Sequence, residues 1–181
     1  MKLTTERLTL REFEERDIND IVGNLNNLNV SRHLLTVPHP YTRKDARWWI
    51  NNCQEKRKER PRKDYNLSIV LKVERKVIGG IGLSKVKRDQ GTADIGYQLG
   101  EDYWRQGFMS EAATVMIDFA FKRLKLRRIE AHIYPENKAS QGLAESLGFK
   151  YEGTRRKAAK TLSTGKIHDV MVYGMLKEDW R

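Results

Sequence analysis

The chain has 181 residues, and its 35 lysines and arginines outnumber its 24 aspartates and glutamates, so the formal net charge is +11. This length suits one domain with its own core, expected over residues 1–181. The lone Cys53 excludes an internal disulfide framework and a thiolate zinc cluster.

The N-terminal segment MKLTTERLTLREF has no long apolar core, and no stretch of the sequence approaches the roughly 18 apolar residues of a membrane span. We therefore expect a cytoplasmic protein without a membrane partner. Charged residues make up 33% of the chain, so most of the positive excess is expected on a solvated surface. The same balance favours an anionic partner, such as nucleic acid or a phosphorylated cofactor.

The first third of the chain predicts a strand followed by two helices. Leu8 and Leu10 share one face of a strand within residues 6–13. Asp17 is expected to cap a helix whose apolar residues are Ile18, Ile21, Val22 and Leu25. After a loop with two prolines, a second helix is indicated by Ala46, Trp49, Ile50 and Cys53. The charged residues 55–64 should end it and lead to a strand.

The remainder predicts three strands, a helix, a strand, a second helix and two final strands. The first three strands cover residues 65–73, 77–84 and 92–100; the glycines of the second, VIGGIGLS, should pack closely against a neighbouring element. The helices are indicated by apolar faces over residues 113–124 and 139–147, the latter capped by Gly148. The order β-α-α-β-β-β-α-β-α-β-β indicates a mixed α/β domain around one sheet.

The turn YWRQGFMSEA enters the first of these two helices. Amides at a helix N-terminus lack partners in the helix and bind phosphates readily. Gly107 lets the backbone approach a ligand, and Arg105 adds a cation whose fork matches phosphate. The turn lacks the lysine of a P-loop, and no helix follows GGIGLS as a dinucleotide fingerprint requires. Taken alone, the turn also fits a purely structural connection.

Three segments together resemble the acyl-CoA-binding core of the GNAT N-acetyltransferases: ADIGYQLGEDYWRQGFMSEA, RRIEAHIYPENKASQGLAESLGFKYEGT and DVMVYGMLKEDW. With TERLTLREFEERD and VPHPYTRKDARWWI, the chain resembles more narrowly the RimJ/RimL-like branch, which acetylates ribosomal-protein N-termini. The resemblance implies one central, mostly antiparallel twisted sheet flanked by about four helices. It also implies acetyl-CoA as co-substrate and no metal; the four histidines are scattered, and no pair has metal-ligand spacing.

By this resemblance, two segments hold the cofactor. The backbone of Tyr97, Gln98 and Leu99 should pair with the pantetheine arm like an added strand. The family's pyrophosphate-binding pattern, Q/R-x-x-G-x-G/A, falls on residues 104–109, where Trp104 and Met109 depart from it. Binding there is mostly through backbone amides, so these departures are tolerable, although Met109 is large enough to crowd the phosphates. The residues expected to bind the cofactor through this turn are Arg105, Gln106, Gly107, Phe108, Met109 and Ser110.

The resemblance also implies the catalytic residues. PENKASQGLAESLGF corresponds to the second cofactor helix, where Asn137 contacts cofactor or substrate and is equally suited to cap the helix. Many family members carry a tyrosine there as the acid for the leaving thiolate; Ala144 stands in its place, and Ser140 is assigned that role. From the chemistry of the reaction, Asp94 is the leading carboxylate for a water relay to the amine, and it equally suits a surface position on its strand; a backbone N–H near Tyr97 is the expected oxyanion donor.

The acceptor is left open by the sequence. An α-amino group has a pKa near 8 and is partly neutral at physiological pH, unlike a lysine near 10.4, which favours a protein N-terminus, such as that of a ribosomal protein. A small amine (polyamine or aminoglycoside) is the second hypothesis. A third is a non-catalytic RNA- or ribosome-binding module, suggested by the basic clusters EKRKERPRK, FKRLKLRR and TRRKAAK. Ribosome association and a homodimer are possible partnerships. The loops around residues 37–41 and 155–168 should set acceptor choice.

Overall fold

The computed structural model describes residues 1–180, in which eight strands form one sheet. The strands are β1 (Lys2–Thr4), β2 (Leu8–Arg11), β3 (Tyr65–Leu71), β4 (Lys76–Lys87), β5 (Thr92–Leu99), β6 (Arg128–Ile133), β7 (Lys150–Lys160) and β8 (Ile167–Leu176). The α-helices are α1 (Ile18–Leu25), α2 (Leu28–Ser31), α3 (Arg43–Lys58), α4 (Phe108–Asp118) and α5 (Lys138–Ser146).

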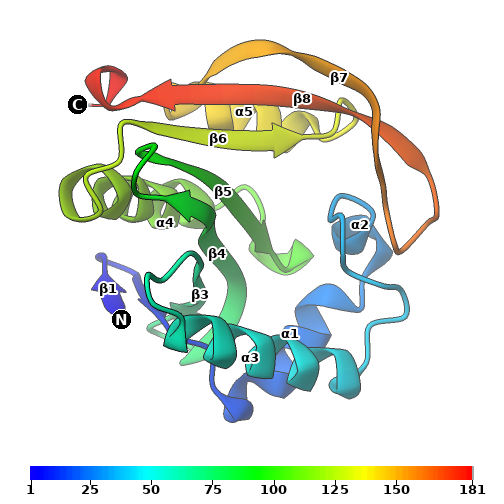
Figure 1. The fold of residues 1–181 in the computed structure, drawn as a ribbon. Helices are drawn as coiled ribbons and strands as arrows, with labels where there is room; N and C mark the ends of the chain where they lie inside the picture. Colours follow the sequence, from blue (N-terminus) through cyan, green and yellow to red (C-terminus); the bar gives the residue numbers. More distant parts are fainter. Residues whose placement is uncertain (181) are drawn as a thin grey trace.

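The strands lie in the order β1-β2-β3-β4-β5-β6-β8-β7. Neighbouring strands are antiparallel except β5 and β6, which are parallel because α4 connects them by a crossover (Figure 1). The expected mixed α/β fold with a mostly antiparallel central sheet is therefore confirmed.

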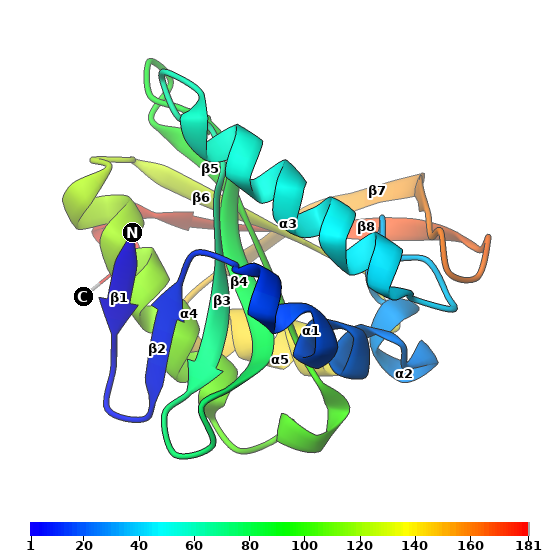
Figure 2. The same ribbon diagram turned by 90° about the horizontal axis from the view of Figure 1, so that it is seen from below.

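Helices cover both faces of this sheet. Seen from below, α1 and α3 lie in front of the strands, and α4 and α5 lie behind them (Figure 2). The larger core fills the α4 side and includes the fully buried Leu67, Ile69, Met116 and Ile117. A second core, with Phe13, Ile21 and Ile50, lies between α1, α3 and the sheet. Apolar positions spaced by helical and strand periods thus converge on the two faces.

The glycines of β4 allow close packing, as expected. A Cβ on Gly79 would collide with the carbonyl oxygen of Gln98 on β5, and one on Gly82 would collide with the side chain of Asn66 on β3. A Cβ on Gly80 would lie 3.1 Å from Cζ of Phe13, which packs over the strand. Larger residues would push β4 away from its neighbours and from the α1–α3 layer.

The sheet opens between β5 and β6. The two strands pair only from Thr92 opposite Arg128 to Ile95 opposite Ala131. Beyond Ile95, β5 stays with β4 to its end at Leu99, whereas β6 continues beside β8 to Ile133. The strands diverge in Figure 1, and we call this opening the wedge.

Several local predictions need correction. Asp17 does not cap α1 with its side chain, because that carboxylate accepts hydrogen bonds from Arg11, at 2.7 and 2.8 Å, and from the amide of Glu14 at 2.9 Å. The strand β1 and the short α2 were not predicted. The predicted strand FKYEGT extends to Lys160, so TRRKAAK belongs to the edge strand β7 rather than a loop. Lysines and arginines are typical of such edges, where they discourage pairing with another chain.

Other local predictions are confirmed. Gly148 has φ +97 at the end of α5, where the Phe149 amide donates to the carbonyl of Ala144 at 3.0 Å. The helix α3 ends at Lys58 and β3 begins at Tyr65, so the charged residues between them are a connection. Among residues 1–180, no helix combines the length and apolar character needed to span a membrane.

Candidate active site

The wedge leaves one edge of β5 without a strand partner. Gly96, Tyr97 and Gln98 pair with β4 on one side. On the β6 side, pairing within residues 1–180 ends at Ile95, so backbone groups pointing into the wedge are free to pair with an extended ligand. This edge suits the pantetheine arm at Tyr97 and Gln98. Leu99 differs, because its carbonyl oxygen accepts a hydrogen bond from the Trp104 indole nitrogen at 3.0 Å.

The turn after β5 presents the N-terminus of α4. Gly107 has φ +77 at the N-cap, a left-handed conformation that favours glycine. The first helical bond runs from the Glu111 amide to the Gly107 carbonyl at 3.1 Å, so the amides of Phe108, Met109 and Ser110 lack helical partners. Gly107, Arg105 and Gln106 are exposed beside them. These amides and the helix dipole favour a phosphate at this position.

Arg7, from the turn before β2, contacts this helix start. Its guanidinium donates to the carbonyl of Gln106 at 3.0 Å and to Glu111 at 2.6 Å, and it lies 4.5 Å from the centre of the Phe108 ring. Nothing in the sequence pointed to Arg7, because about one hundred residues separate it from the turn it contacts. Arg7 therefore braces the turn and places a cation beside the free amides.

Glu111 completes this bracing contact. Its carboxylate also accepts hydrogen bonds from the hydroxyl of Thr5 and from the amide of Arg7. Burial alone raises its pKa, but the bonds from Thr5 and Arg7 outweigh burial, and the net pKa lies below its usual value. Glu111 is thus a carboxylate at neutral pH, placed in the first turn of α4 where the helix dipole favours negative charge.

The Met109 side chain does not crowd the turn. It is 9% exposed and packs in the larger core beneath the sheet, together with Phe108 at 7%. Only the Met109 backbone faces the helix N-terminus. The expectation that a large residue would obstruct the phosphates is therefore wrong, because helical geometry directs this side chain inward while its amide stays outside.

Across the wedge, Tyr97 meets the first turn of α5. Its hydroxyl lies 3.0 Å from Oγ of Ser140. The Asn137 side chain caps α5 by accepting a hydrogen bond from the Ser140 amide at 3.1 Å, which fixes the position of Ser140. Burial raises the pKa of Tyr97 above its usual value, and the hydrogen bond with Ser140 offsets this only in part. The phenol therefore stays protonated at neutral pH. Sequence reasoning used only the Tyr97 backbone and missed this side chain.

Gln98 projects to the opposite face of the sheet from Tyr97. A Cβ on Gly80 would lie 3.3 Å from the side-chain nitrogen Nε2 of Gln98 and 3.1 Å from Phe13. The Gln98 side chain therefore lies on the α1–α3 face. Its Oε1 atom is shielded from solvent and has no hydrogen-bond partner within residues 1–180. A buried acceptor without a donor is costly, so this oxygen is suited to receive a hydrogen bond from a bound molecule.

Asp94 lies on the same face as Gln98, at the closed end of the wedge. Its carboxylate receives a hydrogen bond from Lys85 at 2.8 Å and lies 3.8 Å from Nδ1 of His132. Glu130 completes a group with Asp94 and His132 whose potential ligand atoms lie within 4.8 Å of one another. Sequence reasoning had considered only histidine pairs and missed this group. Glu130 also has a basic partner, Arg128 at 3.0 Å, so both carboxylates are engaged in ion pairs.

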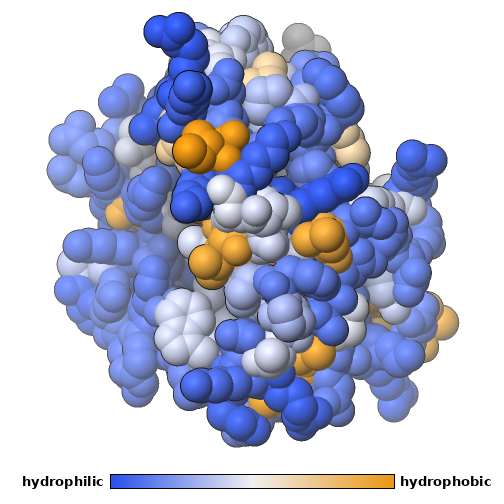
Figure 3. Space-filling model, turned by 90° about the vertical axis from the view of Figure 1, so that its right-hand side faces the viewer, coloured by the Kyte–Doolittle hydropathy of each residue, from blue (hydrophilic) through white to orange (hydrophobic). Residues whose placement is uncertain are grey.

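The β7–β8 turn, part of the segment 155–168 expected to govern acceptor choice, contacts residues 31–35, which directly precede the other expected segment, 37–41. The Leu162 amide in the β7–β8 turn donates to the Leu35 carbonyl at 3.1 Å, and the Ser163 hydroxyl donates to the Ser31 carbonyl at 3.1 Å. Leu35 and Leu162 are 50% and 62% exposed. Figure 3, viewed from this side, shows separate hydrophobic patches within a hydrophilic surface.

His168 lies beneath the same region and is only 7% exposed. Its ring stacks on Tyr134 at 4.4 Å, and its nitrogens lie 3.4 Å from Glu136 and 3.3 Å from the Thr161 hydroxyl. His168 is thus a packed residue that joins β8 to the segment before α5.

The acetyltransferase (GNAT) domain model matches residues 7–150. An uncharacterized N-acetyltransferase p20 from Bacillus licheniformis is 35% identical over 178 residues, covering 98% of this chain and 97% of the relative. A GNAT-family acetyltransferase structure from Bacillus anthracis superposes with a TM-score of 0.82 at 28% identity and covers 98% of this chain and 99% of that one. The chain belongs to the GNAT acetyltransferase family.

Two further similarities concern acceptors. The [ribosomal protein uS5]-alanine N-acetyltransferase of Escherichia coli (strain K12) is 32% identical over 108 residues, 59% of this chain and 55% of the relative. A spermidine N-acetyltransferase from Vibrio cholerae, solved with CoA and spermine, has a TM-score of 0.80 at 21% identity, covering 97% of this chain and 98% of that one. This likeness shows the fold alone. The protein is an N-acetyltransferase, and acetyl-CoA is the donor that GNAT acetyltransferases use.

Proposed function

We propose that this enzyme transfers acetyl from acetyl-CoA to the α-amino group of a protein N-terminus, a ribosomal protein being the leading candidate. The observation that carries the proposal is the charge of the acceptor end. Residues 155–169 contain Arg155, Arg156, Lys157, Lys160 and Lys166, against the single carboxylate of Asp169. A polycationic acceptor would be repelled there, whereas a chain with one α-amine and neutral or acidic neighbours would not.

The acidic groups near this end are already engaged. Lys166 donates to Glu136 at 2.9 Å, and the amide of Lys157 donates to Asp169 at 2.7 Å. The exposed Leu35, Leu162 and Ile167 add apolar surface beside them. This combination supports a peptide over a polyamine or aminoglycoside. The similarity to the uS5-alanine enzyme points the same way.

We expect acetyl-CoA to bind across two segments of the chain. The pantetheine arm would pair with the free edge of β5 at Tyr97 and Gln98, and the pyrophosphate would meet the α4 amides after Gly107, with Arg105 and Arg7 beside it. Acetyl-CoA supplies the acetyl group as a thioester. The wedge would orient that thioester between β5 and α5, so that binding positions the carbonyl for attack.

Three chemical tasks are then assigned to this chain. The hydroxyls of Tyr97 and Ser140, 3.0 Å apart, hold the proton for the departing thiolate. A backbone N–H of β5 near Tyr97 stabilises the developing oxyanion. Asp94, on the same face of the sheet as Gln98, accepts the amine proton through water. A weak base is sufficient here because an α-amine has a pKa near 8. Asn137 positions Ser140 through the helix cap.

The test is an acceptor panel under identical acetyl-CoA concentrations. It contains peptides with free N-termini, the same peptides with blocked N-termini and one free lysine, spermidine, and an aminoglycoside. We expect kcat/KM to be highest for the free N-terminal peptides. A higher value for spermidine or the aminoglycoside would overturn the proposal in favour of the small-amine alternative. If no acceptor is acetylated while RNA binds, the RNA-binding alternative is favoured.

A further inference from the structure

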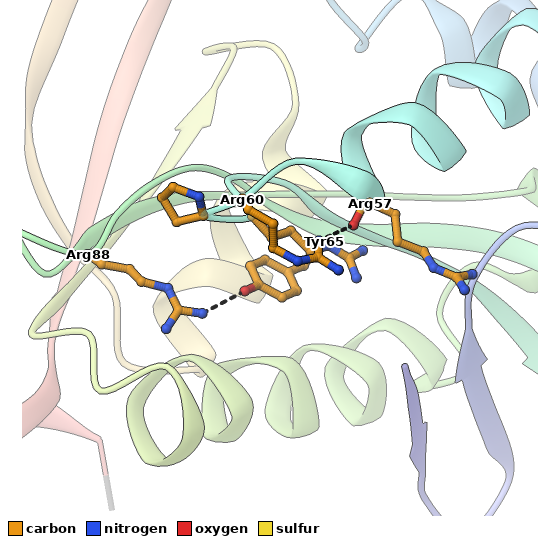
Figure 4. A pocket seen from close by; sticks show the side chains of 6 residues that line it. Arg57, Arg60, Tyr65 and Arg88 are labelled. Carbon is orange, nitrogen blue, oxygen red and sulfur yellow. Dashed lines mark hydrogen bonds between the residues drawn. The ribbon is translucent and has the colours of Figure 1, made fainter.

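A hollow of about 500 Å³ lies at the end of the molecule remote from the wedge. It is lined by Arg57, Arg60, Pro61, Arg62, Tyr65 and Arg88, which come from the C-terminus of α3, the connection to β3, the start of β3 and the β4–β5 turn. In Figure 4, Arg60 lies beside the Tyr65 ring, the Tyr65 hydroxyl points to Arg88, and the Arg57 side chain extends away from the ring on the other side.

The hollow carries an unbalanced positive charge. Four of its six lining residues are arginines, and no acid is among the lining residues that the structure describes. Two carboxylates lie nearby. Asp64 pairs with Lys56 at 3.3 Å, and Glu12 pairs with the N-terminal amine and with Arg62, so the charge of Arg62 is balanced. Arg57, Arg60 and Arg88 are exposed and make no ion pair within residues 1–180, although the exposed Glu59 adjoins Arg60 in sequence.

Hydrogen bonds, a ring contact and one ion pair hold some of these guanidinium groups in place. Arg62 lies 4.5 Å from the centre of the Tyr65 ring and is fixed from behind by Glu12 at 3.0 Å. Arg88 donates to the Tyr65 hydroxyl at 3.0 Å. Arg60 donates to the carbonyls of Arg57 and Glu59 at 3.0 and 2.9 Å. Each guanidinium has five N–H donors, so donors remain for a ligand.

Other basic residues gather around the same end. The carbonyl of Lys63 accepts a hydrogen bond from the Val86 amide, which brings the α3–β3 connection beside Lys85 and Lys87. The amide of Arg127 donates to the carbonyl of Gly91, which brings FKRLKLRR beside the β4–β5 turn. Two basic clusters that are distant in sequence, EKRKERPRK and FKRLKLRR, therefore flank one turn, and neither takes part in acetyl transfer as proposed.

We propose that the arginine hollow binds a multiply charged phosphate anion. Guanidinium forks match pairs of phosphate oxygens, and several arginines lining one hollow favour an extended anion with more than one charge. Two sources share this chemistry: a free polyphosphate and the phosphates of an RNA strand. This hollow is separate from the proposed cofactor site. Lys87 adjoins Arg88 of the hollow, and Gly80 pairs with Gln98 at the wedge; the two lie seven residues apart along β4, a span of about 23 Å.

The test measures binding of tripolyphosphate and of a short single-stranded RNA to the full chain saturated with CoA, which blocks phosphate binding at α4. The variant Arg57→Gln/Arg60→Gln/Arg88→Gln removes three charges from the hollow. The control Arg155→Gln/Arg156→Gln/Lys160→Gln removes three charges from exposed positions of β7. CoA binding and the unliganded melting temperature report whether each variant is folded.

We expect the arginine variant to bind tripolyphosphate at least about tenfold more weakly and the control to bind within about twofold of the parent. Equal losses in both variants, or no loss in the arginine variant, would overturn the proposal. If the triple variant does not fold, Arg88→Gln alone is expected to weaken binding several-fold, and unchanged binding overturns the proposal. Tighter RNA binding, competed by tripolyphosphate, identifies RNA as the source; tighter tripolyphosphate binding identifies a free polyphosphate.

Discussion

The hydroxyl of Tyr97 on β5 lies 3.0 Å from Oγ of Ser140 on α5, so two protonated groups meet inside the wedge. We expect Ser140→Ala and Tyr97→Phe each to lower kcat by about 10- to 100-fold, while the KM for acetyl-CoA changes much less. If the two hydroxyls act as one proton donor, the double variant should lose little more than the worse single variant. Steady-state kinetics of the four enzymes measure this coupling.

If the loss of kcat in the double variant instead equals the product of the two single losses, the hydroxyls act independently. Ala144, which occupies the place of the family's usual tyrosine, allows a complementary test. Because Ala144 is 1% exposed, Ala144→Tyr must displace core atoms, so we expect it to destabilise the fold rather than to rescue Ser140→Ala. Rescue of turnover would contradict the assignment of the acid role to Tyr97 and Ser140.

Gly107 controls the approach to the α4 amides. We expect Gly107→Val to cost about 1–2 kcal/mol of folding free energy, because its φ of +77 disfavours a β-branched residue. It should also raise the KM for acetyl-CoA about tenfold by placing a side chain in front of the helix amides. The matched control is Gly23→Ala in α1, where an added Cβ meets nothing within 4 Å. An unchanged KM in Gly107→Val would remove the turn from the cofactor site.

The periodic spacing of apolar residues in the sequence was sufficient to predict most of the fold. Apolar spacings over residues 113–124 and 139–147 gave α4 and α5, and the motif around Gly107 located the turn. These local patterns could not predict contacts between segments that are distant in the sequence. Arg7 reaches Gln106, and Leu162 reaches Leu35, through the path of the chain in space. The role of the Tyr97 side chain was missed for the same reason. Alternation along β5 predicts which face this side chain lies on, but the divergence of β6 that opens the wedge beside it is a contact between distant segments.

Arg7 is expected to act on cofactor affinity rather than on the chemical step. We predict that Arg7→Met raises the KM for acetyl-CoA by about 5- to 20-fold with kcat nearly unchanged, because both the brace on Gln106 and the nearby cation are lost. Glu111→Gln keeps the cation and weakens the brace, so its effect should be smaller. Isothermal titration with CoA measures both variants, and equal losses would show that the brace alone matters.

The carboxylate of Glu136 makes the stability of the fold depend on pH. A hydrogen bond from Lys166 is the largest of the contacts that lower its pKa to about 2, against an ordinary value of 4.5. Because the folded pKa is depressed, this contribution to stability is complete above pH 4.5 and is lost as pH falls towards 2. We expect Glu136→Gln to lower the melting temperature slightly at pH 6 and hardly at all near pH 2.5. Glu6→Gln, at another exposed carboxylate, is the control.

Gln98 offers the clearest way to separate acceptor binding from cofactor binding. Its buried Oε1 has no donor within residues 1–180 and lies on the α1–α3 face, opposite Tyr97. If the attacking amine approaches from that face, its N–H can donate to this oxygen, and we expect Gln98→Leu to raise the KM for the peptide acceptor about tenfold. The variant keeps the backbone of β5, so the KM for acetyl-CoA should change by less than about twofold. A rise confined to acetyl-CoA would instead place the Gln98 side chain against the cofactor, because removing a group raises the KM of the substrate it contacts.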